Sequence, residues 1–428
     1  MSEFKRHRLA DLYEISSGIS TTKDQAGHGA PFVAFKDIYN NYFIPERLTE
    51  LMDTTPEQQE KFSVREGDVF LTRTSETLDE LAMSSVALQD HPNATFSGFA
   101  KRLRPRDPSN PDPRFMGFFL RSEYFRRIIN SVTTMTTRAS FNEAIFSHVE
   151  VDLPDLDSQV QIGDLLHSIE QQIELNNQVN DNLQAMLQTL YGYWFLQFDF
   201  PDENGRPYRS SGGRMVWNDQ LKREIPAGWR VASLVSNPLC EPLKPGIAPF
   251  SEKTYLATAD VVGTTIKDGS RIRYETREGR ANMEPVLHSV WFAKMKGSVK
   301  HLFLNEACAS LISETILSTG FVGLKCEPVA FEYIASFIAS EQFEPLKDLH
   351  AHGATQQAVN NTDLENILLP IPDAETLRRF SQLASSTLSR FNASIVENKR
   401  LQELRDWLLP MLMNGQATVA SSDKLSFT

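Results

Sequence analysis

Two stretches of the chain carry apolar residues at the spacing of long, paired helices. Between residues 162 and 194, positions four and three residues apart alternate without a break, which is typical of a coiled-coil seam. These positions are Ile162, Leu166, Ile169, Ile173, Asn176, Asn180, Leu183, Leu187, Leu190 and Trp194. A less regular copy comprises Leu388, Phe391, Ile395, Asn398, Leu401, Leu404, Leu408 and Met411. The spacing predicts one long helix over residues 157–195 and a second over the copy, in which Pro410 disfavours a helical conformation at Leu409.

Asn176 and Asn398 are polar residues at seam positions that are otherwise apolar. A buried asparagine in a helix pair typically fixes register and orientation at some cost in stability. We therefore expect both residues to set the register of the helix pair. The alternative is that they face solvent where the two helices splay apart.

The stretches between the helices contain short β-branched and aromatic runs that recur at an offset near 222. The run that ends in Asp37 is repeated at Asp260, an offset of 223, and residues 68–73 are repeated at 289–294, an offset of 221. Residues 97–100 match 319–322 at 222, and residues 151–154 match 367–370 at 216. The shared order and offset favour a duplicated architecture over chance recurrence.

This layout predicts an α+β protein with two similar domains, each followed by a long helix. We expect the first domain over residues 1–154 and its helix over 155–200. A connector and the second domain follow over 201–370, and the second helix over 371–416. The tail, residues 417–428, is small and polar, so we expect it to be disordered.

The charge and the cysteines limit the class of protein. The net charge is -12, but residues 151–200 hold eight acidic residues and no Lys or Arg, so basic surfaces elsewhere remain compatible with it. The chain has no run of eighteen apolar residues and no apolar leader, so we expect no membrane segment and no secretion. Cys240, Cys308 and Cys326 match no zinc or disulfide spacing and suggest a reduced, cytoplasmic protein.

Motifs for catalysis are missing. The sequence contains no Gly-rich phosphate loop that ends in Gly-Lys-Ser/Thr, no Asn/Asp-Pro-Pro-aromatic run of an amino-methyltransferase, and no Gly-x-Ser-x-Gly or His-Glu-x-x-His motif. His350 and His352 have no carboxylate or thiol at ligand spacing, so we expect a surface loop there and no metal site. We therefore expect no catalytic residue and no cofactor in this chain.

Polar and basic residues at strand ends and in loops are the candidates for DNA contacts. Arg and Lys can pair with guanine edges and phosphates, and Gln with adenine edges. In the first domain the candidates are Thr72, Arg73, Thr74, Lys101, Arg102, Arg104 and Arg138. In the second domain they are Arg271, Arg273, Lys294, Lys296, Lys300, Gln356 and Gln357. For any one of these residues a solvated basic rim is the simpler explanation, but matching loops on repeated units favour nucleic acid.

Several segments resemble the specificity subunits of type I restriction-modification enzymes. Residues 153–159, 168–177 and 193–199 are similar to the central region of that family, and residues 201–213 with 225–229 to its entry into a second target recognition domain. Residues 353–360 and 408–415 resemble the stretches before the second helix and at its end. The resemblance covers nearly the whole chain.

The resemblance implies two target recognition domains that each read half of a bipartite, asymmetric site on double-stranded DNA. The two helices would pair antiparallel as a coiled-coil spacer, in a pseudo-twofold arrangement. Two modification subunits would bind S-adenosylmethionine and methylate adenine, and restriction subunits would use ATP and Mg for translocation and cleavage. Two alternatives are the recognition part of a fused methyltransferase or nuclease, and a structural coiled-coil adaptor.

Overall fold

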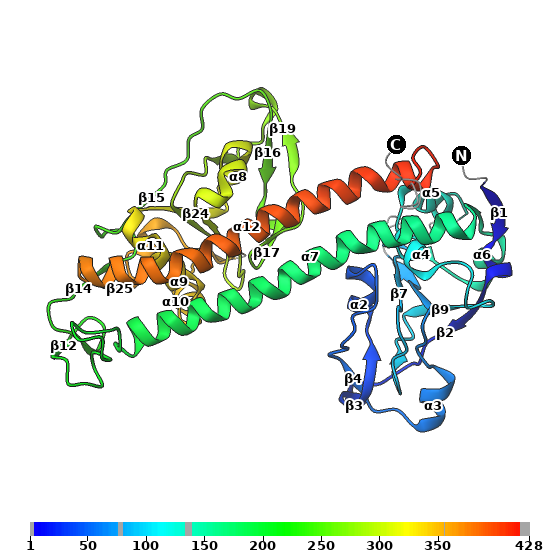
Figure 1. The fold of residues 1–428 in the computed structure, drawn as a ribbon, viewed down its shortest axis with the longest axis horizontal. Helices are drawn as coiled ribbons and strands as arrows, with labels where there is room; N and C mark the ends of the chain where they lie inside the picture. Colours follow the sequence, from blue (N-terminus) through cyan, green and yellow to red (C-terminus); the bar gives the residue numbers. More distant parts are fainter. Residues whose placement is uncertain (1–3, 76–79, 133–138, 355, 420–428) are drawn as a thin grey trace, which may run out of the picture. The chain divides into compact units, whose positions relative to one another are not determined.

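The computed structural model describes residues 4–75, 80–132, 139–354 and 356–419. The chain divides into two compact units (Figure 1): the first unit is Met1–Gln171 with Leu401–Thr428, and the second unit is Gln172–Arg400. Both combine short strands with helices, so the predicted α+β class is confirmed. Within the described residues no helix is long and apolar enough to cross a membrane.

The first unit is built on a four-stranded antiparallel sheet in the order β2–β9–β5–β7. Its elements before the long helix are β1 (Lys5–Arg8), α1 (Leu9–Leu12), β2 (Tyr13–Ser17), β3 (Ala26–Val33), α2 (Phe35–Asn40), β4 (Leu51–Met52), α3 (Pro56–Lys61), β5 (Val69–Thr72), β6 (Thr74–Ser75), β7 (Ser84–Val86), β8 (Thr95–Phe96), β9 (Ala100–Pro105), α4 (Pro113–Phe119), α5 (Glu123–Val132), β10 (Ala139–Ser140), α6 (Glu143–His148) and β11 (Glu150–Leu153). Strand β5 is buried along its whole length, so it forms the centre of the core.

The second unit contains two four-stranded sheets, β15–β24–β21–β22 and β19–β16–β23–β20. Its elements are β12 (Met215–Asn218), β13 (Arg223–Pro226), β14 (Arg230–Ser233), β15 (Cys240–Pro242), β16 (Lys253–Leu256), β17 (Val261–Val262), β18 (Thr265–Ile266), β19 (Ser270–Ile272), β20 (Ala281–Met283), β21 (Ser289–Ala293), β22 (His301–Leu304), α8 (Ala309–Glu314), β23 (Thr315–Ser318), β24 (Phe321–Cys326), α9 (Phe331–Ala339), α10 (Phe343–Leu349), α11 (Asn361–Leu364) and β25 (Leu368–Ile371). Strand β21, like β5, is buried throughout.

The two units share one strand-pairing register. Thr72 of β5 pairs with Ala100 of β9, and Ala293 of β21 pairs with Phe321 of β24, so both strands of the pair repeat at an offset of 221. The next backbone bond repeats as well, from Arg73 N to Phe99 O at 2.8 Å and from Lys294 N to Gly320 O at 2.9 Å. Position 320 therefore corresponds to Phe99, and the sequence match of Gly98 with Gly320 is one residue out of register.

Each long helix follows a strand and begins after an aspartate. Helix α7 (Leu156–Tyr191) follows Asp155, whose Oδ1 accepts a hydrogen bond from Ser158 N at 2.9 Å. Helix α12 (Ala374–Met413) follows Asp373, whose Oδ1 accepts from Thr376 N at 2.9 Å. These caps repeat at an offset of 218, not the 216 of the sequence match.

The corrected offset changes the comparison of the two helices. It aligns Pro154 with Pro372. Asn176 then lies 22 residues after Pro154, and Asn398 lies 26 residues after Pro372. The difference of four residues is about one helical turn. Beyond Tyr191 the chain forms one π-helical turn, Gly192–Leu196, which buries Trp194 and Phe195 against Phe380.

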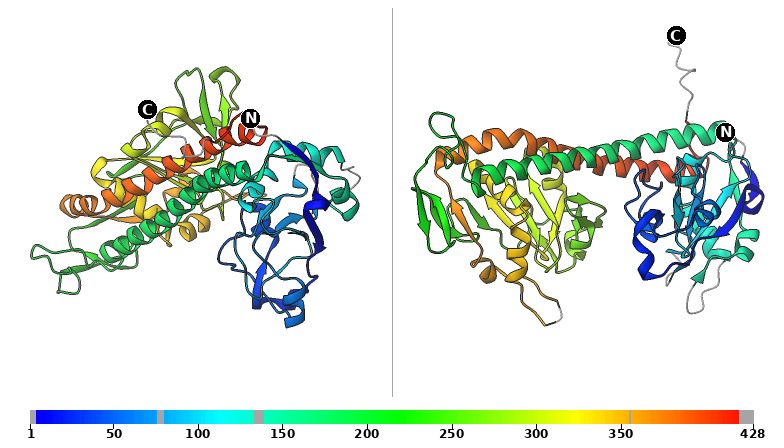
Figure 2. Two further views of the ribbon diagram at one scale, coloured as in Figure 1. Left: turned by 45° about the vertical axis from the view of Figure 1, so that its right-hand side comes forward. Right: turned by 90° about the horizontal axis from the view of Figure 1, so that it is seen from below.

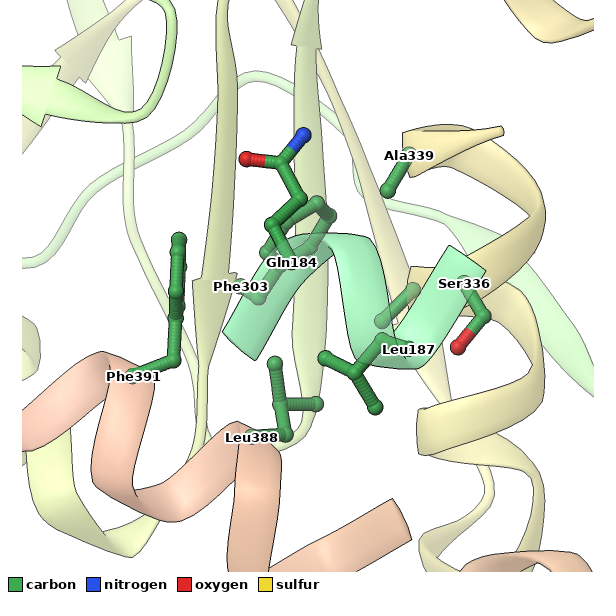
Figure 3. Close-up of a pocket in the computed structure, with 8 residues that line it drawn as sticks. Gln184, Leu187, Phe303, Ser336, Ala339, Leu388 and Phe391 are labelled. Atoms are coloured by element: carbon green, nitrogen blue, oxygen red, sulfur yellow. The ribbon is translucent and has the colours of Figure 1, made fainter. Parts of the chain in front are cut away.

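The helices pair antiparallel within each unit. In the first unit Arg405 Nη1 of α12 donates to Glu170 Oε2 of α7 at 2.9 Å. In the second unit Asn176 Nδ2 donates to Asn398 Oδ1 at 2.9 Å, and further along α7 Leu187 lines one cavity with Leu388 of α12. Residue numbers thus rise on α7 as they fall on α12. This cavity, whose lining residues are drawn in Figure 3, has a volume of only about 10 Å³, so the packing there leaves little void.

Two details of the predicted seam are wrong. Leu404 is 43% exposed, because the neighbouring Arg405 faces α7 and lies 5.2 Å from the Tyr42 ring centroid. Helix α12 also continues through Pro410 to Met413. A proline this close to the helix end removes only one backbone donor, so the last turn survives.

Candidate nucleic-acid interface

The second unit presents two loops that are joined by backbone hydrogen bonds. After β21, Lys296 N donates to Gln357 O at 2.9 Å, and Val359 N donates to Lys294 O at 3.0 Å. Lys296, Gln356 and Gln357 are exposed. We call Lys294, Lys296, Gln356 and Gln357 the second loop cluster. It brings together four of the predicted contact residues.

The β21–β22 turn in this cluster is held by hydrogen bonds to side chains of helix α10. Gly297 N donates to Asp348 Oδ2 at 3.0 Å, and the fully buried Lys347 Nζ donates to Ser298 O at 3.2 Å. Lys347 Nζ lies 2.5 Å from Glu344 Oε2, and His301 Nε2 lies 2.8 Å from Glu344 Oε1. Burial acts to raise the pKa of Glu344, but contacts with His301 and Lys347 lower it below its ordinary value. A charged, paired carboxylate thus holds the turn.

Two lysines of this turn have different surroundings. Burial lowers the pKa of Lys294 from its ordinary value, because the ammonium loses water. Lys300 Nζ instead donates to Thr258 O. Lys294 is half-buried after β21, whereas Lys300 ties two loops of the protein together.

The first unit has the same arrangement. Arg73 follows β5, and Phe141 N donates to Arg73 O at 2.8 Å, while Thr74 pairs with Ser140. Arg73 is exposed and Thr74 half-exposed. Phe99, which the sequence analysis did not select, is 69% exposed beside them. We call Arg73, Thr74 and Phe99 the first loop cluster. Arg138 lies outside the described residues.

Four other predicted contact residues of the first unit have partners inside the protein. Thr72 is buried, and its Oγ1 donates to Glu80 O at 3.1 Å. Lys101 and Arg102 are buried as well, and they donate to Ser17 Oγ at 2.8 Å and to Ser63 O at 2.6 Å. Arg104 donates from Nε and Nη2 to the two carboxylate oxygens of Asp68, at 2.7 and 2.6 Å.

The position of β9 explains this. It is an inner strand between β2 and β5, and residues 100–103, which point alternately to the two faces of the sheet, are all buried. A run of cations in a central strand must find internal partners, because a buried unpaired charge is costly. We therefore withdraw Thr72, Lys101, Arg102 and Arg104 from the proposed contact set.

Arg271 and Arg273 do not correspond to that basic run. The equivalent of β9 is β24, whereas Arg271 lies on β19, at the edge of the other sheet beside β16. Both arginines are exposed. They form a separate basic edge and stay candidates for phosphate contacts only.

The comparisons with known proteins agree on one family. Residues 1–185 match the model of the type I restriction modification DNA specificity domain. The chain is 22% identical to the HindI specificity subunit of Haemophilus influenzae over 97% of this chain and 100% of that one. It is 21% identical to the MjaIX specificity subunit of Methanocaldococcus jannaschii over 96% and 93%.

A solved structure supports the fold. The S subunit of a type I system from M. genitalium superimposes with a TM-score of 0.53 at 12% identity and covers 96% of each chain. The chain, with its two α+β units, thus shares the fold of that S subunit. The resemblance to the specificity subunits of type I restriction-modification systems that the sequence predicted is thus confirmed.

Proposed function

We propose that each unit reads one half of a bipartite, asymmetric DNA site and that the chain directs adenine methylation and restriction by partner subunits. The observation that carries this proposal is the repeat of the loop clusters. The same backbone bonds hold Arg73 in the first unit and Lys294 in the second. The side chains differ, with Arg73, Thr74 and Phe99 in one cluster and lysines with glutamines in the other. One scaffold with two sets of base-reading groups suits an asymmetric site.

The partners in this proposal are two modification subunits, which carry S-adenosylmethionine, and restriction subunits, which use ATP and Mg. The chain itself would contribute recognition and no catalysis, which the missing motifs support. The system would act on DNA in the cytoplasm.

We propose the outer faces of the long helices as the docking surface for the modification subunits. On α12 of the first unit, Leu404 is 43% and Trp407 63% exposed. On α7 of the second unit, Leu175 is 53% and Met186 60% exposed. Eleven residues separate Leu175 from Met186, about three turns, so both lie on one face. Exposed apolar side chains grouped on one face are typical of interfaces.

The test is site selection from a random duplex library by the chain with the modification subunits of its own host. We expect two fixed half-sequences separated by a gap of fixed length and variable sequence. The chain alone, supplied with S-adenosylmethionine, should methylate nothing. A structural adaptor would enrich no sequence, and a recognition part of a fused enzyme would need no separate modification subunit. Trp407→Ala should weaken assembly and leave the selected sequence unchanged.

A further inference from the structure

Phe99 is an aromatic side chain that the first unit holds in solvent. It is 69% exposed, whereas Phe70 and Phe96, which lie on neighbouring strands, are fully buried. Burying a phenylalanine contributes roughly 1.5–3 kcal/mol to stability, and this position forgoes most of that gain. The core of the first unit therefore does not explain a phenylalanine here.

The backbone at Phe99 is fixed on both sides. Phe99 N donates to Ser97 Oγ at 3.2 Å, and Phe99 O accepts from Arg73 N at 2.8 Å. Gly98 N donates to Ile19 O at 2.8 Å, and a Cβ at Gly98 would come within 2.9 Å of that same oxygen. The turn thus presents the ring from a rigid support, as recognition of a defined chemical group requires.

The neighbours of Phe99 indicate what it meets. Arg73, bonded to it through the backbone, and Thr74 are hydrogen-bonding side chains suited to base edges. The major groove, about 12 Å wide, admits an α-helix or a two-stranded β-ribbon and displays a distinct pattern for each base pair. The apolar group that bases present in that groove is the 5-methyl group of thymine.

The second unit lacks this group. Its equivalent position is Gly320, whose carbonyl accepts the hydrogen bond from Lys294 N at 2.9 Å. A Cβ there would meet Thr258 Cγ2 at 2.9 Å, so the position is crowded by a side chain of the second unit itself. The second unit therefore has no side chain at the position that holds the Phe99 ring in the first unit.

We propose that Phe99 contacts the 5-methyl group of a thymine in the half-site that the first unit reads. The inference rests on the proposed function and deepens it, because it names one base and one atom. Phe99 acts as a specificity-determining residue. Gly320 has no side chain, so the second unit does not distinguish a base with a methyl group from one without it at the matching position.

The test replaces each thymine of the selected site, one at a time, with deoxyuridine, which removes only the methyl group. The assembled complex of the full chain with modification subunits should lose about fourfold in affinity at one thymine of one half-site, the factor that corresponds to one methyl-sized apolar group. Phe99→Ala should bind the thymine and uracil sites equally. Phe99→Leu, which keeps an apolar side chain, should keep part of the discrimination.

A matched control is Trp217→Ala, which removes another exposed aromatic ring, 62% exposed, from the β12–β13 hairpin. It should keep the full thymine preference. The inference is overturned if Phe99→Ala still discriminates, if no thymine in either half-site is sensitive, or if the sensitive thymine lies in the half-site that Lys296→Ala alters. Failure of the wild-type complex to select any site would instead refute the proposed function.

Discussion

The Asp68–Arg104 pair gives a direct test of whether the basic run on β9 is structural. The Asp68 side chain is fully buried and that of Arg104 is 23% exposed. Asp68 Oδ2 also accepts from Arg65 N at 2.8 Å. Asp68→Asn keeps the volume of the side chain but leaves the guanidinium without its counter-charge.

Breaking a buried pair by removing one partner costs about 3–5 kcal/mol, and partial exposure of Arg104 reduces that figure to about 2–3 kcal/mol. In a unit of this size, 1 kcal/mol shifts the melting temperature by about 2–4 °C. We therefore expect Asp68→Asn to lower the melting temperature of the first unit by roughly 4–12 °C. Differential scanning calorimetry measures this shift.

DNA binding separates the two interpretations. At a temperature below both transitions, Asp68→Asn should bind the selected site within twofold of wild type, and Arg104→Met should leave the salt dependence of binding unchanged. The matched control is Arg73→Ala, which should lower affinity without lowering the melting temperature. An unchanged melting temperature for Asp68→Asn, together with a salt slope reduced by about one for Arg104→Met, would show that Arg104 contacts DNA phosphate.

Three further predictions concern the helices and the thiols. Asn398→Leu removes one of the two hydrogen bonds that Asn176 Nδ2 donates, the other being to Glu397, and should cost about 0.5–1.5 kcal/mol in urea unfolding. Asn176→Leu combined with Asn398→Leu should restore or raise stability and relax the preference for one gap length, whereas additive losses would contradict this. Inserting four residues after Val179 and four after Ile395 lengthens the helix pair by about 6 Å. Site selection should then return the same half-sequences with a gap that is one or two base pairs longer. Altered half-sequences at the old gap length would show that the helices read bases. Burial raises the pKa of Cys240 to about 11 and that of Cys308 to about 12. At pH 8 a thiol reagent should therefore label these cysteines slowly in the native protein and at once in the guanidinium-unfolded protein. Rapid labelling of the native protein would refute the burial of these thiols.

The helix pair and the duplication could be predicted because both depend on local patterns. A seam with a period of 3.5 residues is visible in the sequence from residue 162 to residue 194, about nine turns, and strands such as those at residues 68–73 and 289–294 repeat in order. The register could not be predicted as well. Short matches placed Pro154 against Pro370, whereas the hydrogen bonds of the Asp155 and Asp373 caps show that Pro372 is the equivalent residue.

The candidate contact residues depended on burial, which a sequence pattern does not reveal. Arg104 looks like part of a solvated basic run, but its partner Asp68 lies 36 residues earlier in the chain. Phe99 looks like a core residue, because an aromatic side chain at a strand start usually is one. In both cases the tertiary pairing of β5 with β9 decides which side chain reaches solvent.

The central claim is that each loop cluster reads its own half of the DNA site. The measurement is site selection by the assembled complex with wild-type chain, with Arg73→Ala, and with Lys296→Ala combined with Gln357→Ala. The account predicts that Arg73→Ala relaxes base preference in one half-site only and the double variant in the other half-site only, with the gap unchanged in both. A variant that relaxes both half-sites, or both variants relaxing the same one, would contradict it.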